Sequence, residues 1–313
     1  MKNRYNKNCV VICGPTASGK THLAVHLSLL FNGEIISADS RQVYRGLNIG
    51  SGKDLEEYST SRGKVDVHLI DIRDPSEVYT LYHFKQDFFT IIDQIRDRNR
   101  LPFLAGGTGL YIESILRNFD IPQIPEDVEF RKRYMTKDKA DLVEELKRRS
   151  PELYERTDLS SKKRVIRALE IVQFSQVEAI VGQQSLPVLK LDPVVLCTRW
   201  ERSMLYERID KRLAERIDNG MIDEVKNLLD SGVSSDRLIQ LGMEYKHIVH
   251  YLKGRVSLEQ MITLLKTDIH QLAKRQETWF RGMERRGVPV TWIDQADCET
   301  AEKALNKELV MDD

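Results

Sequence analysis

Short apolar runs alternate with segments of helical periodicity in the first part of the chain. Four runs predict buried strands, at Asn8–Cys13, Glu34–Ala38, Val67–Asp71 and Pro102–Ala105. Between them, apolar residues recur every three or four positions in Lys20–Phe31 and in Leu81–Asn99, which predicts helices. Strands alternating with helices favour an α/β fold, in which a parallel sheet is covered by helices on both faces.

The pattern changes after about residue 119. Phe119–Glu126 contains two prolines and predicts a linker, whereas Arg131–Ile180 is rich in charge and predicts helices without a clear strand. An apolar run at Val194–Thr198 predicts a return to the core sheet. We therefore expect a core formed by residues 1–119 and 191–313, with a helical insertion domain at residues 120–190.

Helical periodicity dominates the rest of the chain. Ser257 and Gln260 match a capping box, which predicts the start of a long helix that reaches about Arg286. Its apolar stripe includes Phe280, so we expect Phe280 and the adjacent Trp279 to pack in the core. A final short strand is predicted at Val288–Ile293.

Composition narrows the class of protein. Among 313 residues, Lys and Arg number 48 and Asp and Glu number 48, so the chain is not a diffuse polycation. A nucleic-acid partner remains possible, because clustering of charge matters more than its sum. The cysteines contain no C-x-x-C pair, which argues against a zinc knuckle. No apolar run long enough to cross a membrane and no signal-peptide pattern is present, so we expect a cytoplasmic, monomeric enzyme with no membrane partner.

The stretch between the first predicted strand and helix matches the phosphate-binding pattern G-x-x-x-x-G-K-[ST]. It consists of Gly14, Pro15, Thr16, Ala17, Ser18, Gly19, Lys20 and Thr21. The glycines let the backbone close around an oxyanion, and the helix start adds its positive dipole end. Lys20 supplies an ammonium group, and the Thr21 hydroxyl can hold Mg²⁺. The loop therefore predicts binding of a diphosphate or polyphosphate without deciding which.

Many P-loop ATPases, GTPases and kinases add an acidic residue after a second strand to hold the metal. Two residues are candidates, since Asp39 follows the second predicted strand and Asp71 ends the third. Neither of them settles the reaction. A nucleoside or small-molecule kinase that binds ATP, and a non-catalytic RNA-binding P-loop protein, both remain open at this point.

Further segments narrow the choice. In order along the chain they are DSRQVY (39–44), GSGK (50–53), DPSEVYT (74–80), GGTGLY (106–111), KRVIRALE (163–170), ERIDKR (207–212), GMIDE (220–224) and AKRQETWFR (273–281). With the phosphate loop, they resemble the tRNA dimethylallyltransferase (tRNA isopentenyltransferase) family. The resemblance is to the bacterial type, because the zinc finger of eukaryotic relatives is absent. One departure is Leu241–Lys246, LGMEYK, where the family's tyrosine is displaced.

The resemblance implies a P-loop NTPase (kinase-like) parallel sheet core flanked by helices, with a helical insertion domain. It implies transfer of the dimethylallyl group of dimethylallyl diphosphate to N6 of an adenine next to the anticodon (tRNA position 37), with release of diphosphate. Mg²⁺ is the implied cofactor, and the anticodon stem-loop of tRNA is the implied partner. If the protein were instead a kinase, its matches to the family's DSRQVY and GGTGLY segments would be a coincidence.

The catalytic candidates are Asp39, Thr16 and Arg212, and Arg208 is a further candidate for binding the diphosphate. Asp39 is placed to take the proton from the adenine amine, although it could instead be a metal ligand or a turn cap. The Thr16 hydroxyl could hydrogen-bond the bridging oxygen, or only cap the loop. Arg208 and Arg212 share a helix face and are candidates for clamping the diphosphate, and the family pattern points to Arg212. The alternative for both arginines is a solvated salt-bridge face.

The expected tRNA-binding residues fall in three stretches and one glycine-rich turn, all within the family-matched segments. They are Asp39, Ser40, Arg41 and Gln42; Thr108; Lys163, Arg164, Val165, Ile166 and Arg167; and Lys274, Arg275, Thr278 and Arg281. An adenine must leave the stack before its N6 can react, so phosphate contacts and base-edge contacts are both needed. For the charged clusters, the alternative is again a solvated face.

Overall fold

The computed structural model describes residues 6–119, 121, 124, 126–178 and 191–309, without the side chains of residues 175–178. The chain divides into two compact units, Met1–Phe119 with Val188–Asp313, and Asp120–Pro187. The first boundary agrees with the predicted division after residue 119. The predicted return to the core near residue 190 lies outside the described residues.

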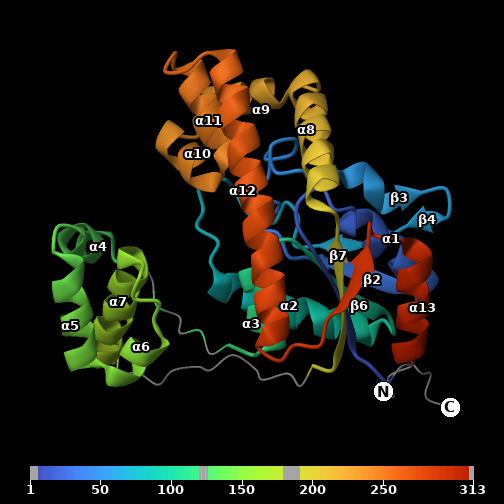
Figure 1. Ribbon diagram of the computed structural model, residues 1–313, viewed down its shortest axis with the longest axis horizontal. Helices are drawn as coiled ribbons and strands as arrows, with labels where there is room; N and C mark the ends of the chain where they lie inside the picture. The colour runs from blue at the N-terminus through green and yellow to red at the C-terminus, as the bar shows by residue number, and fades with distance from the viewer. Residues whose placement is uncertain (1–5, 120, 122–123, 125, 179–190, 310–313) are drawn as a thin grey trace. The chain divides into compact units, whose positions relative to one another are not determined.

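The larger unit is built on a parallel sheet (Figure 1). Its strands are β1 (Cys9–Cys13), β2 (Gly33–Ser37), β5 (Val67–His68), β6 (Leu101–Gly106), β7 (Pro193–Arg199) and β8 (Thr291–Asp294). Their order is β5-β2-β6-β1-β7-β8, and every pairing is parallel. The predicted strand Val67–Asp71 pairs only at its first residues, because the chain turns at Leu69 (φ 63°) and Asp71 (φ 56°).

Strand β1 lies at the centre of the sheet and positions the site. All of its residues are buried, and its last residue, Cys13, pairs in register with Gly106 of β6 and Cys197 of β7. The carboxyl ends of these three strands therefore meet at one edge. The phosphate loop, the glycine-rich turn and Thr198 all leave the sheet at that edge, which brings segments distant in sequence together.

Helices cover both faces of the sheet. In chain order they are α1 (Lys20–Leu30), α2 (Leu81–Asp97), α3 (Gly109–Leu116), α8 (Arg202–Asp218), α9 (Met221–Asp230), α10 (Ser235–Leu241), α11 (Met243–Leu252), α12 (Leu258–Arg285) and α13 (Cys298–Glu308). Val10 and Ile12 of β1 pack in one apolar cluster with residues of α1 and α13. Val11 and Cys13 pack in the opposite cluster with residues of α2 and α3. This alternation confirms the expected three-layer arrangement.

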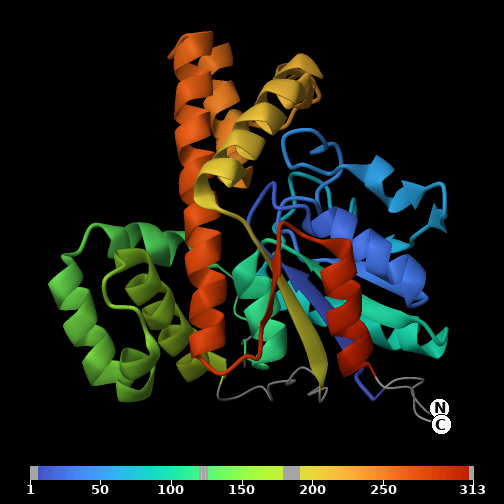
Figure 2. The same ribbon diagram turned by 45° about the vertical axis from the view of Figure 1, so that its right-hand side comes forward.

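Helix α12 joins the sheet to a group of helices. It contacts α3 beside the sheet and also contacts α8 and α11 (Figures 1 and 2). The predicted capping box is confirmed, since Ser257 and Gln260 satisfy each other's backbone N–H groups at its start. Phe280 is fully buried, as the apolar stripe predicted.

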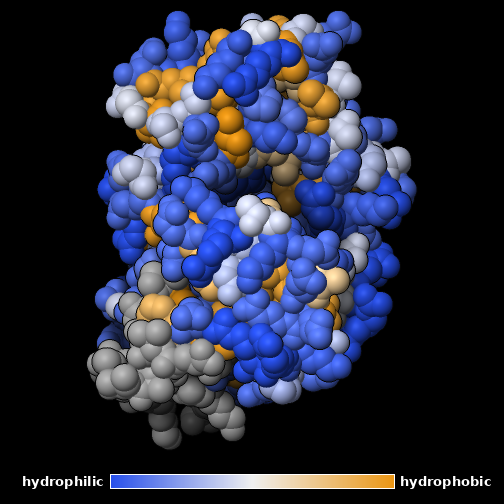
Figure 3. Space-filling view, turned by 90° about the vertical axis from the view of Figure 1, so that its left-hand side faces the viewer, coloured by the Kyte–Doolittle hydropathy of each residue, from blue (hydrophilic) through white to orange (hydrophobic). Residues whose placement is uncertain are grey.

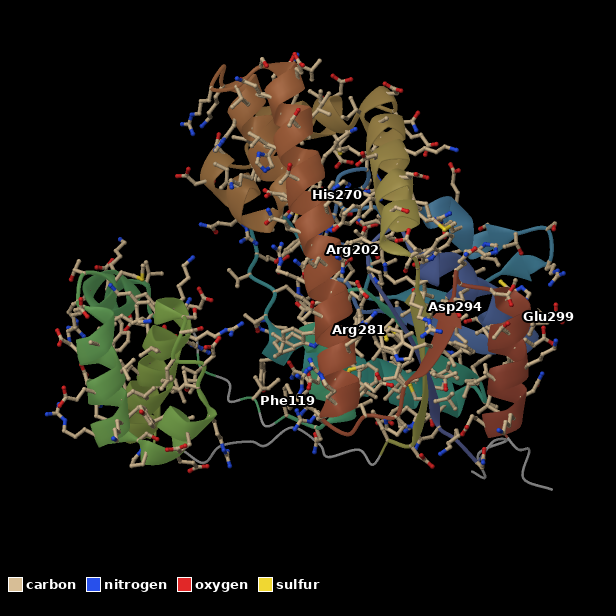
Figure 4. All side chains as sticks on the ribbon, in the orientation of Figure 1. Phe119, Arg202, His270, Arg281, Asp294 and Glu299 are labelled. Carbon is tan, nitrogen blue, oxygen red and sulfur yellow. The ribbon has the colours of Figure 1, made fainter. Side chains whose placement is uncertain are left out.

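A polar contact fixes α8 against α12. His270 Nε2 of α12 lies 2.9 Å from Asp210 Oδ1 of α8, and the His270 ring stacks on Tyr206 with the ring centroids 4.0 Å apart (Figure 4). Stacking and a hydrogen bond together orient one helix on the other. The side chains on the next turns of α8 are therefore held in place.

A short segment after β2 completes the larger unit. It contains the 3₁₀ turn η1 (Leu55–Tyr58) and a small hairpin of β3 (Ser59–Thr60) and β4 (Gly63–Lys64). Tyr58 is buried and packs with the cluster that contains α1 and α13. This segment brings Asp54 and Tyr58 to the edge of the sheet where the phosphate loop lies.

The smaller unit is helical over its described residues. It comprises α4 (Val128–Met135), α5 (Lys139–Arg149), α6 (Pro151–Arg156) and α7 (Lys162–Glu178). Its own apolar cluster includes Phe130, Leu142 and Leu169. Glu170 is 3% exposed and receives hydrogen bonds from Arg131, with Nη2 to Oε2 at 2.8 Å. A separate core of this kind is what an insertion domain needs to fold as a unit.

The surface carries few large apolar groups. The face in Figure 3 is hydrophilic over most of its area, with hydrophobic residues in small separate groups. Within the described part of the chain, no helix is long and apolar enough to cross a membrane. Isolated apolar residues on a surface need no partner to explain them.

Candidate active site

The phosphate loop depends on two glycines. A Cβ on Gly14 would lie 2.0 Å from Thr198 Oγ1, so no other residue fits there. Gly19 has φ 83° at the N-cap of α1, a conformation that favours glycine. The helix then begins at Lys20, with its positive end directed at the loop.

The outer side of the loop is held by β7 and α8. Ser18 Oγ lies 2.6 Å from Thr198 Oγ1, and Trp200 Nε1 donates to the Ser18 carbonyl at 3.0 Å. Arg208 Nε donates to the Ala17 carbonyl at 2.9 Å, with its guanidinium 4.3 Å from the centre of the Trp200 ring. These contacts engage the loop's side chains and carbonyls rather than its inward N–H groups.

Arg208 was predicted to bind the diphosphate, and this stays a prediction. Its Nε is committed to the Ala17 carbonyl and its guanidinium lies over the Trp200 ring, and Arg208 lines neither the cleft over the loop nor the pocket beside it. In the structure, Arg208 positions the loop. The sequence could not separate it from Arg212, because the two lie on the same helix face.

The inner side of the loop is joined to the glycine-rich turn by Gln276 of α12. The Thr16 N–H donates to Gln276 Oε1 at 2.8 Å, and Gln276 Nε2 donates to the Gly107 carbonyl at 2.9 Å. The glycines of this turn allow close approach. A Cβ on Gly106 would lie 2.3 Å from the Ala38 carbonyl oxygen, and one on Gly109 would lie 2.4 Å from Trp279 Cδ1.

Asp39 follows β2 and is held at the start of its turn. The Arg41 N–H donates to Asp39 Oδ1 at 2.9 Å, and the Asp39 side chain is one-fifth exposed (20%). The Ser40 N–H donates to Thr108 Oγ1 at 3.2 Å, which ties this turn to the glycine-rich turn. Asp39 thus keeps carboxylate lone pairs available while its position is fixed.

Gln42 was predicted to pair with a base edge. Its Oε1 accepts from Ser37 Oγ at 3.0 Å, and its Nε2 donates to the Gly52 carbonyl at 3.0 Å. The amide is therefore engaged at both ends, and Gln42 holds the segment that includes Gly52. Pairing with a base stays a prediction and would require these contacts to exchange.

A cleft of about 640 Å³, open solvent included, lies over the phosphate loop. It brings together seven predicted site residues: Thr16, Lys20, Thr21, Asp39, Arg41, Gln42 and Arg212. Asp71, the other acidic candidate, does not line this cleft, and its Oδ1 accepts from Lys53 Nζ at 2.5 Å. The structure therefore favours Asp39 over Asp71 as the functional carboxylate.

Lys20 extends along the floor of the cleft. Its Nζ donates to the Pro15 carbonyl at 3.1 Å. The pKa of Lys20 is lowered to about 8, mainly by desolvation and then by repulsion from Arg212, while attraction to Asp39 limits the shift. A bound diphosphate would favour the ammonium form, so Lys20 is suited to anion binding near neutral pH.

A second pocket, of about 370 Å³ with open solvent included, adjoins the first. Its apolar lining residues are Ala17, Ile209, Leu213, Met221, Ile269 and Leu272. Thr16, Arg212 and Arg216 line both cavities, so they mark the junction between a polar cleft and an apolar pocket. This arrangement accommodates a ligand with a phosphate group at one end and a hydrocarbon group at the other.

Three charged residues near the junction were not singled out from the sequence: Asp54, Glu244 and Arg216. Arg212 pairs with Asp54 of the segment after β2, and Arg41 pairs with Glu244 of α11. Arg216 lies one turn beyond Arg212 on α8. Only its four-residue spacing from Arg212 could have indicated that it faces the same way.

The displaced tyrosine segment keeps a structural role. Tyr245 is fully buried, and its hydroxyl lies 3.2 Å from Glu224 Oε1. Glu224 also accepts the backbone N–H groups of Ile49 at 2.6 Å and Gly50 at 3.1 Å. The segment therefore fixes the loop that leads to Gly52, beside the cleft.

The residues present fit a magnesium ion. Thr21 and Asp39 line the same cleft and offer oxygen atoms, which Mg²⁺ prefers. No group of three or more His, Cys, Asp and Glu residues that could hold a metal occurs in the described part of the chain. Mg²⁺ does not require such a group, because it commonly keeps several waters and takes phosphate oxygens as ligands.

The predicted tRNA-binding residues of α12 lie on its exposed side. Lys274, Arg275, Thr278 and Arg281 are all exposed. Arg281, labelled in Figure 4, pairs with Glu277 one turn earlier, with Nη2 to Oε1 at 2.7 Å. The exposure agrees with the prediction and equally with a solvated face.

The predicted tRNA-binding residues on α7 of the insertion differ in exposure. Lys163 and Arg164 are exposed, and Arg164 pairs with Asp158. Val165 and Ile166 were predicted to bind tRNA, but their side chains are 0% and 2% exposed in the small unit's core. That prediction is wrong for their side chains, because the apolar face of the helix is what folds the unit.

Arg167 contributes to the fold of the smaller unit. Its Nη2 donates to the Ile124 carbonyl at 2.8 Å, and it pairs with the buried Glu170. This engagement leaves Lys163 and Arg164 as the exposed members of the predicted cluster on this helix. Binding of tRNA by any of them stays a prediction.

Two family models match the chain. Residues 42–283 match a model described as IPP transferase, and residues 7–71 match one described as Isopentenyl transferase. The chain belongs to the IPP transferase family. The family resemblance predicted from the sequence is thus confirmed.

Relatives in this family match nearly the full length of the chain. tRNA dimethylallyltransferase 1 of Syntrophus aciditrophicus is 43% identical over 303 residues, which cover 97% of this chain and 99% of that protein. tRNA dimethylallyltransferase 2 of Syntrophotalea carbinolica is 46% identical over 290 residues, which cover 92% and 95%. The similarity therefore includes both the core and the insertion.

Solved structures in the family support the fold. The tRNA isopentenylpyrophosphate transferase of Bacillus halodurans aligns with a TM-score of 0.69 at 36% identity, covering 96% of this chain and 95% of that chain. A eukaryotic dimethylallyltransferase described as acting on tRNA aligns with a TM-score of 0.74 at 24% identity, covering 96% and 78%. The latter bears on the fold alone. The predicted P-loop NTPase-like sheet is confirmed.

Proposed function

We propose that this protein transfers the dimethylallyl group of dimethylallyl diphosphate to N6 of an adenine next to the anticodon of tRNA. Family membership supports the reaction class, because the relatives carry the name tRNA dimethylallyltransferase. The arrangement of the two cavities supports the donor. Diphosphate is the product that leaves.

The single observation that carries the proposal is the junction at Thr16. A polar cleft over a phosphate loop adjoins a pocket lined mainly by apolar side chains such as Leu213 and Ile269, with Glu244 and the residues of the junction as its polar members. A five-carbon prenyl group is apolar and gains by leaving water, whereas an adenosine group carries many polar atoms that such a lining would leave unpaired. The pocket therefore favours a prenyl diphosphate over ATP.

Departure of the diphosphate requires stabilisation of growing negative charge. The loop N–H groups, the start of α1 and Lys20 all direct positive charge at the same volume. Arg212, at the junction, adds a guanidinium once it exchanges part of its contact with Asp54. Thr16 lies where its hydroxyl would meet the oxygen that bridges phosphate and prenyl group.

Asp39 is the proposed base. The adenine amine must lose a proton as the new C–N bond forms, and a carboxylate within the cleft suits that role. Asp39 lines the same cleft as Lys20, and only one of its oxygens is committed to the Arg41 N–H. The proton therefore has an acceptor on the chain itself.

Thr21 would hold Mg²⁺. When bound, the ion neutralises charge on the diphosphate oxygens. The loop N–H groups and Lys20 bind the same phosphates independently of it. Thr21, water and phosphate oxygens can complete the ion's coordination. Asp39 therefore remains available to act as the base.

The exposed basic residues are the proposed tRNA contacts. Lys274, Arg275 and Arg281 lie on one side of α12, and Lys163 and Arg164 lie on α7 of the insertion. Ser40, Arg41 and Thr108, beside the cleft, would contact the flipped base. Because residues of one chain line both cavities, we propose a monomer, acting in the cytoplasm where tRNA is found.

The test compares donors and acceptors directly. Purified protein is incubated with labelled dimethylallyl diphosphate, Mg²⁺ and total tRNA, and label is followed into RNA. In parallel, melting temperatures are measured with dimethylallyl diphosphate and with ATP and Mg²⁺, since the bound ligand stabilises the fold. Label in tRNA adenine supports the proposal. Robust ATP turnover without tRNA would instead support a kinase.

A further inference from the structure

Arg216 is a buried cation without hydrogen-bond partners at two of its nitrogen atoms. Its side chain is 15% exposed, and its Nε and Nη2 atoms are buried. Among the residues that the structure describes, neither atom has a hydrogen-bond partner. Its Nη2 lies 3.9 Å from Asp54 Oδ2, beyond hydrogen-bond distance.

The electrostatic surroundings do not supply a full counter-charge. The pKa of Arg216 is lowered to about 10, mainly by burial and then by repulsion from Arg212 and Arg41, while Asp54 and Glu244 act in the opposite direction. Asp54 pairs with Arg212, and Glu244 pairs with Arg41. Arg216 therefore stays charged at neutral pH with no carboxylate of its own, an arrangement that costs free energy unless a ligand completes it.

The backbone makes room for this guanidinium. A Cβ on Gly52 would lie 2.1 Å from Arg216 Nη2 and 3.2 Å from Arg212 Nη2. Gly52 has φ 70°, so glycine suits this position for its conformation as well. Gln42 holds the Gly52 carbonyl, which fixes this wall of the cleft. The guanidinium thus occupies a built recess.

Arg216 also lies where the two cavities meet. It lines the phosphate cleft and the apolar pocket, as Thr16 and Arg212 do. A prenyl diphosphate lying across this junction places its hydrocarbon end in the pocket and its first phosphate at the boundary. The distal phosphate then lies deeper over the loop, toward Lys20.

We infer that the guanidinium of Arg216 binds the phosphate that carries the prenyl group. This assignment rests on the proposed function of the site. A guanidinium presents two parallel N–H groups that match a phosphate bidentately. The ligand thereby supplies the acceptors that the chain lacks.

The contact grows stronger as the reaction proceeds. The bond between N6 of adenine and C1 of the prenyl group forms while the bond between C1 and the bridging oxygen breaks. The electron pair of the broken bond remains on that oxygen, and the N6 proton passes to Asp39. The phosphate that Arg216 contacts gains the charge, so Arg216 stabilises the leaving group.

The experiment replaces Arg216 with methionine, which fills similar volume without charge. Affinities for inorganic diphosphate and for dimethylallyl diphosphate are measured by calorimetry, and the melting temperature is measured without ligand. We expect both affinities to fall about 10- to 100-fold. The melting temperature without ligand should stay equal or rise, because an uncompensated buried charge has been removed.

The matched control is Lys211→Met on the same helix, since Lys211 is 80% exposed and takes no part in either cavity. It should change neither affinity. Arg216→Lys keeps the charge but loses the two-pronged geometry, so its affinities should fall between those of Arg216→Met and the unaltered protein.

Two results would overturn the inference. One is an unchanged affinity of Arg216→Met for both diphosphates. The other is a lowered melting temperature without ligand in both Arg216 variants, which would make Arg216 a structural residue. Failure of the proposed function gives a different result, because the unaltered protein would then bind ATP in preference to dimethylallyl diphosphate.

Discussion

Gln276 accepts a hydrogen bond from the backbone N–H of Thr16 at 2.8 Å, across 260 residues of sequence. The same side chain donates to Gly107, so one amide fixes the phosphate loop and the glycine-rich turn relative to each other. The first segment carries Thr16 and the second carries Thr108, both of which are proposed to contact substrates. Helix α12 therefore positions both segments through one side chain, that of Gln276.

Replacement of Gln276 by leucine should slow the reaction. Loss of a hydrogen bond of this kind costs roughly 0.5–1.5 kcal/mol, and we expect kcat to fall about 3- to 10-fold as Thr16 loses its fixed position. Steady-state kinetics with saturating tRNA would measure this. Gln271→Leu, at an exposed position of the same helix, is the control. An equal effect of both changes would contradict a specific role for Gln276.

Asp39→Asn tests the proposed base. Asparagine keeps an oxygen for the Arg41 N–H, so the turn should survive while the proton acceptor is lost. We expect the single-turnover rate to fall about 10²–10⁴-fold with nearly unchanged donor affinity. Rapid-quench measurement with prebound donor separates the two quantities.

The control for Asp39 is Asp71→Asn. Asp71 was the alternative acidic candidate, and it pairs with Lys53 away from the cleft. Asparagine keeps an acceptor for Lys53, so the single-turnover rate should stay close to that of the unaltered protein. A near-normal rate for Asp39→Asn would remove Asp39 from the mechanism.

Diphosphate affinity should depend on pH through Lys20. Its pKa is lowered to about 8, so the ammonium that binds the anion is largely present below pH 8 and is lost as pH rises through 8. Between about pH 8 and 9.5, affinity should fall by roughly 15-fold in total. Lys20→Arg keeps its charge over this range and should show a flat profile. A flat profile for the unaltered protein would contradict the role of Lys20.

Thr21→Ala tests the proposed magnesium ligand. Loss of the hydroxyl should raise the Mg²⁺ concentration for half-maximal activity by about tenfold, because an oxygen ligand is missing. Titration of activity against Mg²⁺ measures this directly. Thr21→Ser restores the hydroxyl and should restore the titration curve. If serine and alanine behave alike, Thr21 does not hold the ion.

The sheet and its motifs were predictable from sequence because they rest on local signals. An apolar run next to a glycine-rich phosphate loop predicted β1 and α1, and both are present. The short end of β5 was not predictable, because the left-handed turns at Leu69 and Asp71 involve residues that rarely adopt them. The hydrophobic pattern of a sequence indicates which residues are buried, but it does not indicate where the pairing between strands ends.

Roles within the site were less predictable, because they depend on which neighbour a side chain meets. Arg208, Arg212 and Arg216 share one helix face, yet the first braces a carbonyl, the second pairs with Asp54 and the third faces the junction of the cavities. Val165 and Ile166 show the same limit, since a family match does not separate contact residues from core residues. Tertiary contacts assign these roles.

The last prediction concerns the exposed charges of the insertion. Arg167 supports the fold through Ile124 and Glu170, so the informative variant removes only Lys163 and Arg164. If these two contact phosphates, tRNA affinity should fall, and its logarithmic salt dependence should lose about 0.7–0.9 of slope per contact. Donor affinity should stay unchanged, because the diphosphate lies on the loop of the other unit.

The matched control removes two exposed charges elsewhere in the insertion, Lys132 on α4 and Arg156 on α6, which are 70% and 74% exposed. Binding of tRNA is measured over a salt series for both double-alanine variants, with donor binding by calorimetry alongside. Equal loss of tRNA affinity in both would indicate a diffuse electrostatic effect. An unchanged slope for the Lys163 and Arg164 variant would make the cluster a solvated face. Each phosphate contact releases a counterion when tRNA binds, so the loss of a real contact must lower the slope.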